Sequence, residues 1–224
     1  MDSAVVLLSG GVDSTTLLHD LKRREQIPAL YALSIVYGQR HAREIACAEY
    51  QAAAAGAILH RVVDLSVFAN VVTGGTALTS GPLAVPDYAQ LSAEDLCQPP
   101  TYVPNRNMLL LALAAAYAEA RGVQAVFYGA QTQDRYGYWD CTAEFVERLN
   151  AVLALNRKKA VTVHAPYCGM RKAAIIRIGV SLGVDYGHTW TCYRGGLTPC
   201  AACPACVERA AAFREAGLPD PLLQ

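Results

Sequence analysis

The sequence predicts an α/β fold with an open, mostly parallel sheet that carries helices on both faces. Short apolar runs alternate with helix-like segments over residues 4–65, which is the βαβαβ pattern of such sheets. The pair Gly10-Gly11 stands between the first apolar run and the first helix-like segment, at the edge where open α/β sheets bind ligands. Because the chain has 224 residues, we expect one large domain with at most a small appendage.

The first half of the chain supplies the clearest elements. Residues 4–8 are short, apolar and followed by glycine, which is typical of a buried parallel strand. Leu17, Leu18 and Leu21 share one face of the next segment, and Gly56 ends an alanine-rich helix. The expected elements are strands at 4–8, 30–36 and 59–65 and helices at 14–24 and 42–55.

Residues 66–104 break this rhythm with repeated glycines and prolines. A loop of this length is usually functional, so we expect a lid or a substrate loop there. The alternation then resumes, with Gly122 and Gly183 ending two helices. The remaining expected elements are helices at 105–121, 142–155, 172–182 and 207–216 and strands at 125–130 and 161–164.

The charge composition limits the kinds of partner that the protein is expected to bind. The 19 Lys and Arg residues balance 19 Asp and Glu residues, so the chain lacks the basic footprint of a protein that binds long nucleic acid or an anionic membrane. Its longest apolar run, 108–118, is far shorter than the ~20 residues that span a bilayer, and no signal peptide pattern opens the chain. We expect a soluble, cytoplasmic protein that acts on a small molecule.

The stretch Ser9-Gly10-Gly11-Val12-Asp13-Ser14 has the features of a phosphate-binding loop. Glycines let the backbone approach an anion, a helix N-terminus offers N–H donors, and serine hydroxyls add further donors. Asp13 suits this position if a cation such as Mg²⁺ lies between it and phosphate. The spacing matches neither the Walker A nor the Gly-x-Gly-x-x-Gly pattern. The alternative is a turn capped by Ser or Asp. The residues expected to bind the nucleotide are Leu8, Ser9, Gly10, Gly11, Val12, Asp13, Ser14 and Thr15.

Four of the eight cysteines cluster near the C-terminus as Cys192-x7-Cys200-x2-Cys203-x2-Cys206. Four thiolates at this spacing predict a tetrahedral Zn²⁺ site, and because the protein fills every position, the metal should be structural. An iron–sulfur cluster and uncoordinated cysteines are the alternatives. The scattered cysteines are expected to be small buried hydrophobes; they are Cys47, Cys97, Cys141 and Cys168.

The glycine loop resembles the Ser-Gly-Gly-x-Asp-Ser signature of the N-type ATP pyrophosphatases, or PP-loop family, whose adenine nucleotide alpha hydrolase-like fold agrees with the predicted sheet. Further stretches resemble one branch of it, the QueC family of 7-cyano-7-deazaguanine synthases. They are "LSGGVDSTTLL" (8–18), "YGQRH" (37–41), "RVVDLS" (61–66), "TYVPNRN" (101–107), "AAAYAEA" (114–120), "GYWDC" (137–141), "HAP" (164–166), "TWTCY" (189–193) and the four C-terminal cysteines.

The resemblance implies a reaction and a division of the chain. Members of the family convert 7-carboxy-7-deazaguanine and ammonia to the nitrile 7-cyano-7-deazaguanine through an adenylate and an amide, using ATP, in queuosine biosynthesis. Residues 1–190 would form the PP-loop catalytic domain and 191–224 the zinc-binding motif and final helix. The cofactors would be ATP, Mg²⁺ and structural Zn²⁺. We expect a homodimer, with ammonia free or delivered by a partner, because no glutaminase domain fits beside this fold.

The resemblance also assigns roles to residues. Lys172, Arg106 and Asp13 would be catalytic, with Lys172 neutralising phosphate and Arg106 pairing with phosphate or the substrate carboxylate. The residues expected to bind substrate are Tyr37, Gln39, Arg40, His41, Arg106, Asn107, Tyr138 and Asp140.

Each of these roles has a structural alternative. Lys172 could be a solvated residue at a helix start, and Arg106 a surface residue behind an Asn105 cap. His41 could be a loop histidine hydrogen-bonded to Glu44. The aromatic loop at 136–140 could pack on the core.

Several positions depart from the family pattern. Ile35-Val36 stand before Tyr37 where the family has Phe-Asp, Trp139, Thr142 and Ala143 replace other residues, and 170–175 read "MRKAAI". These changes fall in expected substrate loops, so three alternatives remain. They are a QueC-like relative that passes the carboxylate to a different amine, a tRNA-thiolating enzyme that uses Cys141, and a nucleotide-binding protein without activity.

Overall fold

The computed structural model describes residues 1–40, 43–79, 81–132 and 137–223. Its centre is a five-stranded sheet in the order β3-β2-β1-β4-β5, in which every neighbouring pair is parallel. The strands are β1 (Ser3–Leu7), β2 (Ala29–Val36), β3 (Leu59–Asp64), β4 (Ala125–Phe127) and β5 (Thr162–His164). The order reverses at β1, which pairs with both β2 and β4, and ligands bind beyond the carboxyl ends of strands at such a point.

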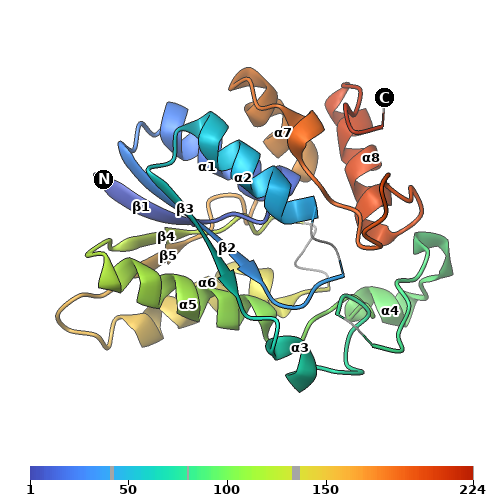
Figure 1. Cartoon of the computed structure of the whole chain (residues 1–224), viewed down its shortest axis with the longest axis horizontal. Helices are drawn as coiled ribbons and strands as arrows, with labels where there is room; N and C mark the ends of the chain where they lie inside the picture. Colours follow the sequence, from blue (N-terminus) through green and yellow to red (C-terminus); the bar gives the residue numbers. More distant parts are fainter. Residues whose placement is uncertain (41–42, 80, 133–136, 224) are drawn as a thin grey trace.

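Helices cover both faces of the sheet, as the sequence predicts (Figure 1). The side chains of β1 alternate between two buried clusters, because successive residues of a strand point to opposite faces. Ala4 and Val6 pack with one set of helices, whereas Val5 packs with the other. The helices are α1 (Val12–Arg23), α2 (Arg43–Ala55), α3 (Phe68–Val71), α4 (Ala93–Cys97), α5 (Arg106–Ala120), α6 (Ala143–Leu153), α7 (Lys172–Ser181) and α8 (Pro204–Ala216).

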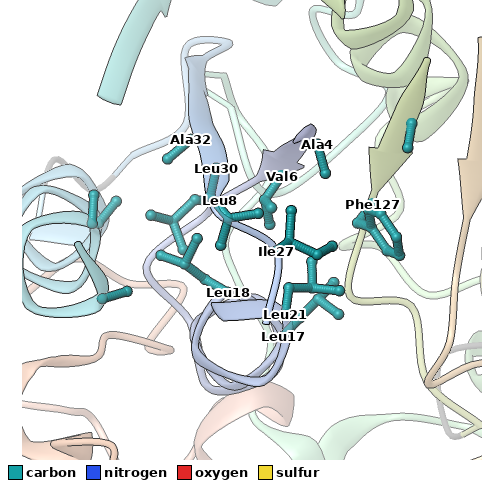
Figure 2. Packing of buried hydrophobic residues seen from close by; sticks show 14 of the residues in the cluster. Ala4, Val6, Leu8, Leu17, Leu18, Leu21, Ile27, Leu30, Ala32 and Phe127 are labelled. Carbon is teal, nitrogen blue, oxygen red and sulfur yellow. The ribbon is translucent and has the colours of Figure 1, made fainter. Parts of the chain in front are cut away.

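On one face, the leucines of α1 enclose the core. Leu17 and Leu18 are fully buried and meet Val6 and Leu30 of the sheet (Figure 2). Alanines of α2 and Ile175 of α7 complete this cluster. Burial of one such leucine stabilises the fold by about 1.5–3 kcal/mol, so the α1–sheet contact is a firm base for the loop between them. On the opposite face, α5 and α6 contribute the residues Leu111, Ala114, Ala115, Ala118 and Phe145.

Three predicted elements differ from the structure by more than a shift of one or two residues at an end. The strand expected at 125–130 ends at Phe127, because the chain then approaches α1: a Cβ on Gly129 would lie 3.0 Å from the amide nitrogen of Ser14. The last helix begins at Pro204 and not at 207, since proline suits the first position of a helix. The expected loop 66–104 contains α3, α4 and a short 3₁₀ turn, η1 (Tyr88–Gln90).

The C-terminal tail packs on the rest of the chain. Ala212 and Phe213 of α8 share a buried cluster with Ile176 of α7 and Val12 of α1. Among the described residues, no helix combines the length and hydropathy that a membrane crossing requires.

Candidate active site

The glycine turn after β1 is built by close packing. Gly10 has φ +81, a conformation that favours glycine, and a Cβ there would overlap the carbonyl oxygen of Glu44. Gly11 precedes the first turn of α1, and no side chain caps that helix end. The start of a helix offers N–H donors and a partial positive charge, so this end of α1 favours an anion.

Two serines hold the turn in shape. The Ser14 hydroxyl accepts a hydrogen bond from the Ser9 amide at 3.1 Å and lies 2.9 Å from the Ser9 hydroxyl. The amide of Gly11 in turn donates to the Ser9 hydroxyl at 3.2 Å. The loop is thus preorganised by its own side chains before any ligand binds.

A buried lysine faces this loop from α7. Lys172 is only 7% exposed, and its Nζ lies 3.4 Å from Asp13 Oδ2 and 3.9 Å from Glu208 Oε2. A buried ammonium is costly unless it is paired, and the two carboxylates provide that pairing. The first turn of a helix is an unfavourable place for a cation, so the position of Lys172 is explained by these two acidic neighbours.

A cavity of about 750 Å³ opens beside the loop. It lies beyond the carboxyl ends of β1, β2 and β4, and its size falls within the usual range for small-molecule sites. The cavity brings together most residues that the sequence singles out. Those that line it are Leu8, Ser9, Gly11, Val12, Asp13, Ser14, Tyr37, Gln39, Arg106, Asn107, Tyr138 and Lys172.

Arg106 and Tyr37 form one wall. An Nη1 donor of Arg106 lies 3.4 Å from the Tyr37 hydroxyl, and the guanidinium lies 5.7 Å from the Tyr37 ring centroid. Glu44, on the first turn of α2, lines the same region. Burial raises the pKa of the Glu44 carboxyl to about 8, against the opposing effect of the Arg106 charge. This wall therefore combines a cation with a carboxyl group that holds its proton near neutral pH.

Asn107 and Asp140 bond mainly to each other and to a neighbouring residue of the chain. The Asn107 amide donates to Asp140 Oδ2 at 3.0 Å, and its side chain donates to Cys141 Sγ at 3.1 Å. Asp140 is 2% exposed, and burial raises the pKa of its carboxyl. Asp140 is outside the cavity lining and caps the start of α5, whereas Tyr138, which lies 2.9 Å from the Thr101 hydroxyl, does line the cavity.

Of the four remaining predicted site residues, three do not line the cavity and one is not described by the structure. Arg40 lies outside the lining, since its guanidinium is engaged by the backbone carbonyls of residues 77, 79, 81 and 83 at 2.8–3.1 Å. Gly10 packs against α2, and Thr15 is fully buried within α1. His41 falls outside the described residues.

Four lining residues were not among the predicted site residues. They are Trp190 and Tyr193, which belong to the "TWTCY" stretch, and Glu44 and Glu208, which belong to no quoted stretch. Glu44 stands three residues after the "YGQRH" stretch, in the first turn of a helix at the ligand-bearing edge. This position could have identified Glu44 as a candidate site residue from the sequence. Glu208 has no such local signal, because α8 reaches the site only through tertiary packing.

The four C-terminal cysteines form a candidate metal centre. Their sulfur atoms all lie within 4.8 Å of one another, and Cys200 Sγ is 3.9 Å from Cys206 Sγ. Four sulfurs at ~2.3 Å from a tetrahedral Zn²⁺ lie about 3.8 Å apart, so the donor set fits. A hydrogen bond from Cys206 lowers the pKa of the Cys203 thiol to about 5, and backbone amides donate to the sulfurs of Cys192 and Cys200. The same hydrogen bond raises the pKa of the Cys206 thiol, and burial raises the pKa of the Cys192 thiol, so a bound metal would have to displace protons from these two sulfurs.

The sheet order and the loop define a protein of the PP-loop class, and solved structures agree on the fold. The structure aligns with NMN synthetase from Francisella tularensis over 97% of this chain and 78% of that one, with a TM-score of 0.53 and 12% identity. It aligns with the tRNA thiolase NcsA from Methanococcus maripaludis over 86% of this chain and 62% of that one, with a TM-score of 0.50 and 14% identity. Identities this low show the fold alone.

Sequence comparison identifies the family. The family model described as "Queuosine biosynthesis protein QueC" matches residues 3–217. The chain belongs to the QueC family. It is 42% identical to a 7-cyano-7-deazaguanine synthase of Caldicellulosiruptor saccharolyticus, over 98% of this chain and 94% of the relative. It is 44% identical to a synthase of the same name from Marinobacter nauticus, over 99% of this chain and 96% of the relative.

Proposed function

We propose that the protein is a 7-cyano-7-deazaguanine synthase that converts 7-carboxy-7-deazaguanine, ammonia and ATP to the nitrile. The observation that carries this proposal is the serine-locked glycine turn opposite Lys172, at the mouth of a cavity of about 750 Å³, in a chain that belongs to the QueC family. Membership of the QueC family supports the type of reaction. The geometry supports a binding site for the nucleotide phosphates beside a small-molecule cavity.

The reaction balances in two ATP-dependent halves. A carboxylate oxygen of the substrate attacks the α-phosphate of ATP, and pyrophosphate leaves. Ammonia then displaces AMP, which gives the amide after loss of a proton. The amide oxygen attacks the α-phosphate of a second ATP, and pyrophosphate leaves. Loss of AMP, which carries away the amide oxygen, and of both amide protons then leaves the nitrile. Adenylation is needed because a carboxylate, or an amide, is a poor electrophile without a good leaving group.

The phosphate end of the site would be held by the loop. The hydroxyls of Ser9 and Ser14 and the amides at the start of α1 would face the pyrophosphate, and Lys172 would neutralise charge that develops on it. Asp13 is suited to hold Mg²⁺, because a hard cation bound to a carboxylate and to phosphate oxygens removes their mutual repulsion. The 3.4 Å contact between Lys172 and Asp13 would then open or be shared with the ion.

The opposite end would receive the deazaguanine. Tyr37 and Tyr138 offer aromatic surface to a planar ring, and Arg106 offers a guanidinium to a carboxylate or phosphate. Glu44 and Asn107 add hydrogen-bonding groups to the same space. These polar groups are few and lie among apolar side chains, as is usual where orientation must be specific.

Two of the departures from the family pattern, Trp139 and Thr142, can be compared with the cavity wall, whereas a third, Ile35, lines it. The Trp139 indole donates to the Tyr102 hydroxyl at 2.8 Å, and Trp139 is not among the described residues that line the cavity. The Thr142 hydroxyl caps α6 by accepting from the Phe145 amide at 3.1 Å. Two of the altered positions therefore serve local structure and leave the cavity wall unchanged.

The remaining assignments complete the proposal. The C-terminal cysteines would hold a structural Zn²⁺, since all four positions come from the chain. Clustered thiols suit a reducing compartment, so we place the enzyme in the cytoplasm. Ammonia would arrive free or from a partner. A homodimer would use apolar surface such as Met108 of α5, which is 42% exposed.

The decisive experiment measures pyrophosphate release and product mass. With 7-carboxy-7-deazaguanine, ATP, Mg²⁺ and ammonia, we expect pyrophosphate and a product with the mass of the nitrile. Without ammonia, release should be limited to about one equivalent per site. No release with this substrate would refute the proposal. Release that yields neither amide nor nitrile would indicate a QueC-like relative with a different amine acceptor.

A further inference from the structure

Residues 85–99, which we call the cover segment, form part of the cavity wall. The segment contains η1 and α4, each closed by its own capping box, so its internal hydrogen bonds are local. The amide of Ala77 donates to the carbonyl of Pro100 at 2.7 Å, which joins the two ends of the loop. The position of the segment over the cavity therefore depends on its contacts with distant parts of the chain. Its cavity-lining residues are Tyr88, Leu91, Cys97 and Pro99.

Those contacts come from residues 192–203, which carry three of the four clustered cysteines and which we call the cysteine hairpin. Nη2 of Arg194 donates to the Val85 carbonyl at 2.9 Å and to Asp87 Oδ1 at 2.7 Å. The Tyr88 amide donates to the Ala202 carbonyl at 2.8 Å. In Figure 1 the green region around α4 faces the red C-terminal region in agreement with these bonds.

The anchoring is stronger than a lone surface ion pair. An exposed pair contributes about 0–1 kcal/mol, but here one guanidinium nitrogen holds a carbonyl and a carboxylate two residues apart, beside a backbone hydrogen bond. Val85 is buried in one cluster with Cys192, Cys203 and Cys206. The hairpin thus fixes both the backbone and a side chain at the start of the cover segment.

We propose that Arg194 is a positioning residue, through which the cysteine hairpin holds the cover segment over the cavity and sets the affinity for the deazaguanine substrate. The proposal deepens the function proposed above and rests on it for the identity of the substrate. Arg194 stands two residues after Cys192, so one loop carries both a candidate metal ligand and the guanidinium that anchors the cover segment. The glycine loop is on another part of the wall, so ATP binding should be affected less.

The first test needs no activity. Amide hydrogen exchange of the cover segment is compared in the wild type, Arg194→Ala and Asp87→Asn. We expect three- to tenfold faster exchange within residues 85–99 in both variants, with β1 and α1 unchanged. Arg148→Ala, which removes an exposed ion pair with Glu144 on α6, is the matched control and should leave the cover segment unaltered.

The second test separates substrate affinity from chemistry. In Arg194→Ala we expect the KM for 7-carboxy-7-deazaguanine to rise three- to tenfold, with kcat and the KM for ATP within twofold of the wild type. Arg194→Lys keeps the charge near Asp87 but lacks the planar fork, so it should recover part of the loss. A merely structural arginine would lower the amount of active enzyme and leave both KM values unchanged.

Each of the two tests can refute the proposal by itself. If exchange in the cover segment is the same in wild type and Arg194→Ala, the positioning role is refuted whatever the activity. If exchange rises but the KM for the deazaguanine is unchanged, the hairpin anchors the segment without setting affinity, which also refutes the proposal. If the wild type releases no pyrophosphate, the proposed function fails while the exchange result still decides the anchoring.

Discussion

Lys172 Nζ lies 3.4 Å from Asp13 Oδ2, so the first turn of α7 meets the first turn of α1 at the glycine loop. The two residues belong to helices far apart in the sequence, and both helices begin at the carboxyl edge of the sheet. Glu208, from α8, completes the cluster at 3.9 Å from the same nitrogen. The site therefore holds two carboxylates and one ammonium next to uncapped helix amides, an arrangement that a polyphosphate with a divalent cation would balance.

Replacing this lysine tests its role. Lys172→Met should reduce kcat about 10²–10³-fold, because a preorganised cation opposite the developing phosphate charge is lost. Steady-state pyrophosphate release measures the effect, and circular dichroism confirms that the variant is folded. Lys158→Ala, an exposed lysine away from the cavity, should keep full activity. A folded Lys172→Met enzyme with near wild-type kcat would exclude a catalytic role.

Glu44 predicts a pH dependence of stability. Burial raises the pKa of its carboxyl from 4.5 to about 8. Between these values the folded chain holds a proton that the unfolded chain releases, so stability present at low pH is lost as the pH rises through 8. Glu44→Gln should therefore increase the free energy of unfolding by about 1–3 kcal/mol at pH 9 and change it little at pH 5.

Urea unfolding at the two pH values measures this difference. Glu119→Gln, an exposed change on α5, is the control and should have the same effect at both pH values. An equal effect of Glu44→Gln at pH 5 and pH 9 would show that the carboxyl does not hold its proton in the folded state.

Metal content tests the cysteine cluster. The purified chain should contain one Zn²⁺, and Cys206→Ser should lose it. A loss of about 3 kcal/mol would lower the melting temperature by about 6–12 °C for a chain of this size. Elemental analysis and calorimetry measure the two effects, with the exposed Cys97→Ser as control. Iron with visible absorbance in place of zinc would favour the iron–sulfur alternative.

Cys141 discriminates between the proposed reaction and thiolation. Cys141→Ser should keep turnover within about threefold, since serine also accepts the hydrogen bond that Asn107 donates to Cys141 Sγ at 3.1 Å. A folded variant with no activity would instead indicate a catalytic thiol. The comparison is informative because Cys141 lines the cavity, where a reactive thiol would have to lie.

The predicted elements and the structure agree best where signals are local. The apolar run before Gly10-Gly11 and the leucines of α1 predicted a buried strand and helix, and both are present. The α/β class, the parallel sheet and the QueC family are confirmed. The strand after Gln124 was predicted too long, because its early end depends on the approach of Gly129 to α1 and not on its apolar pattern.

The roles of single residues also depend on tertiary contacts that no local pattern reveals. Arg40 and Asp140 look like ligand contacts in a motif, yet Arg40 binds four loop carbonyls and Asp140 caps α5. Glu44 and Glu208 have no motif that marks them, yet both line the cavity. A side chain's type shows what it can bind, but its direction depends on the packing of the element that carries it.

The sequence by itself determined the strand–glycine–helix unit and the four-cysteine spacing, because each depends on residues close together in the chain. Only the tertiary structure decided that Lys172 faces Asp13, that Glu44 shares a wall with Arg106, and that Arg194 holds the cover segment. These contacts join distant segments, so they arise from how helices pack on the sheet and from which charges that packing buries together.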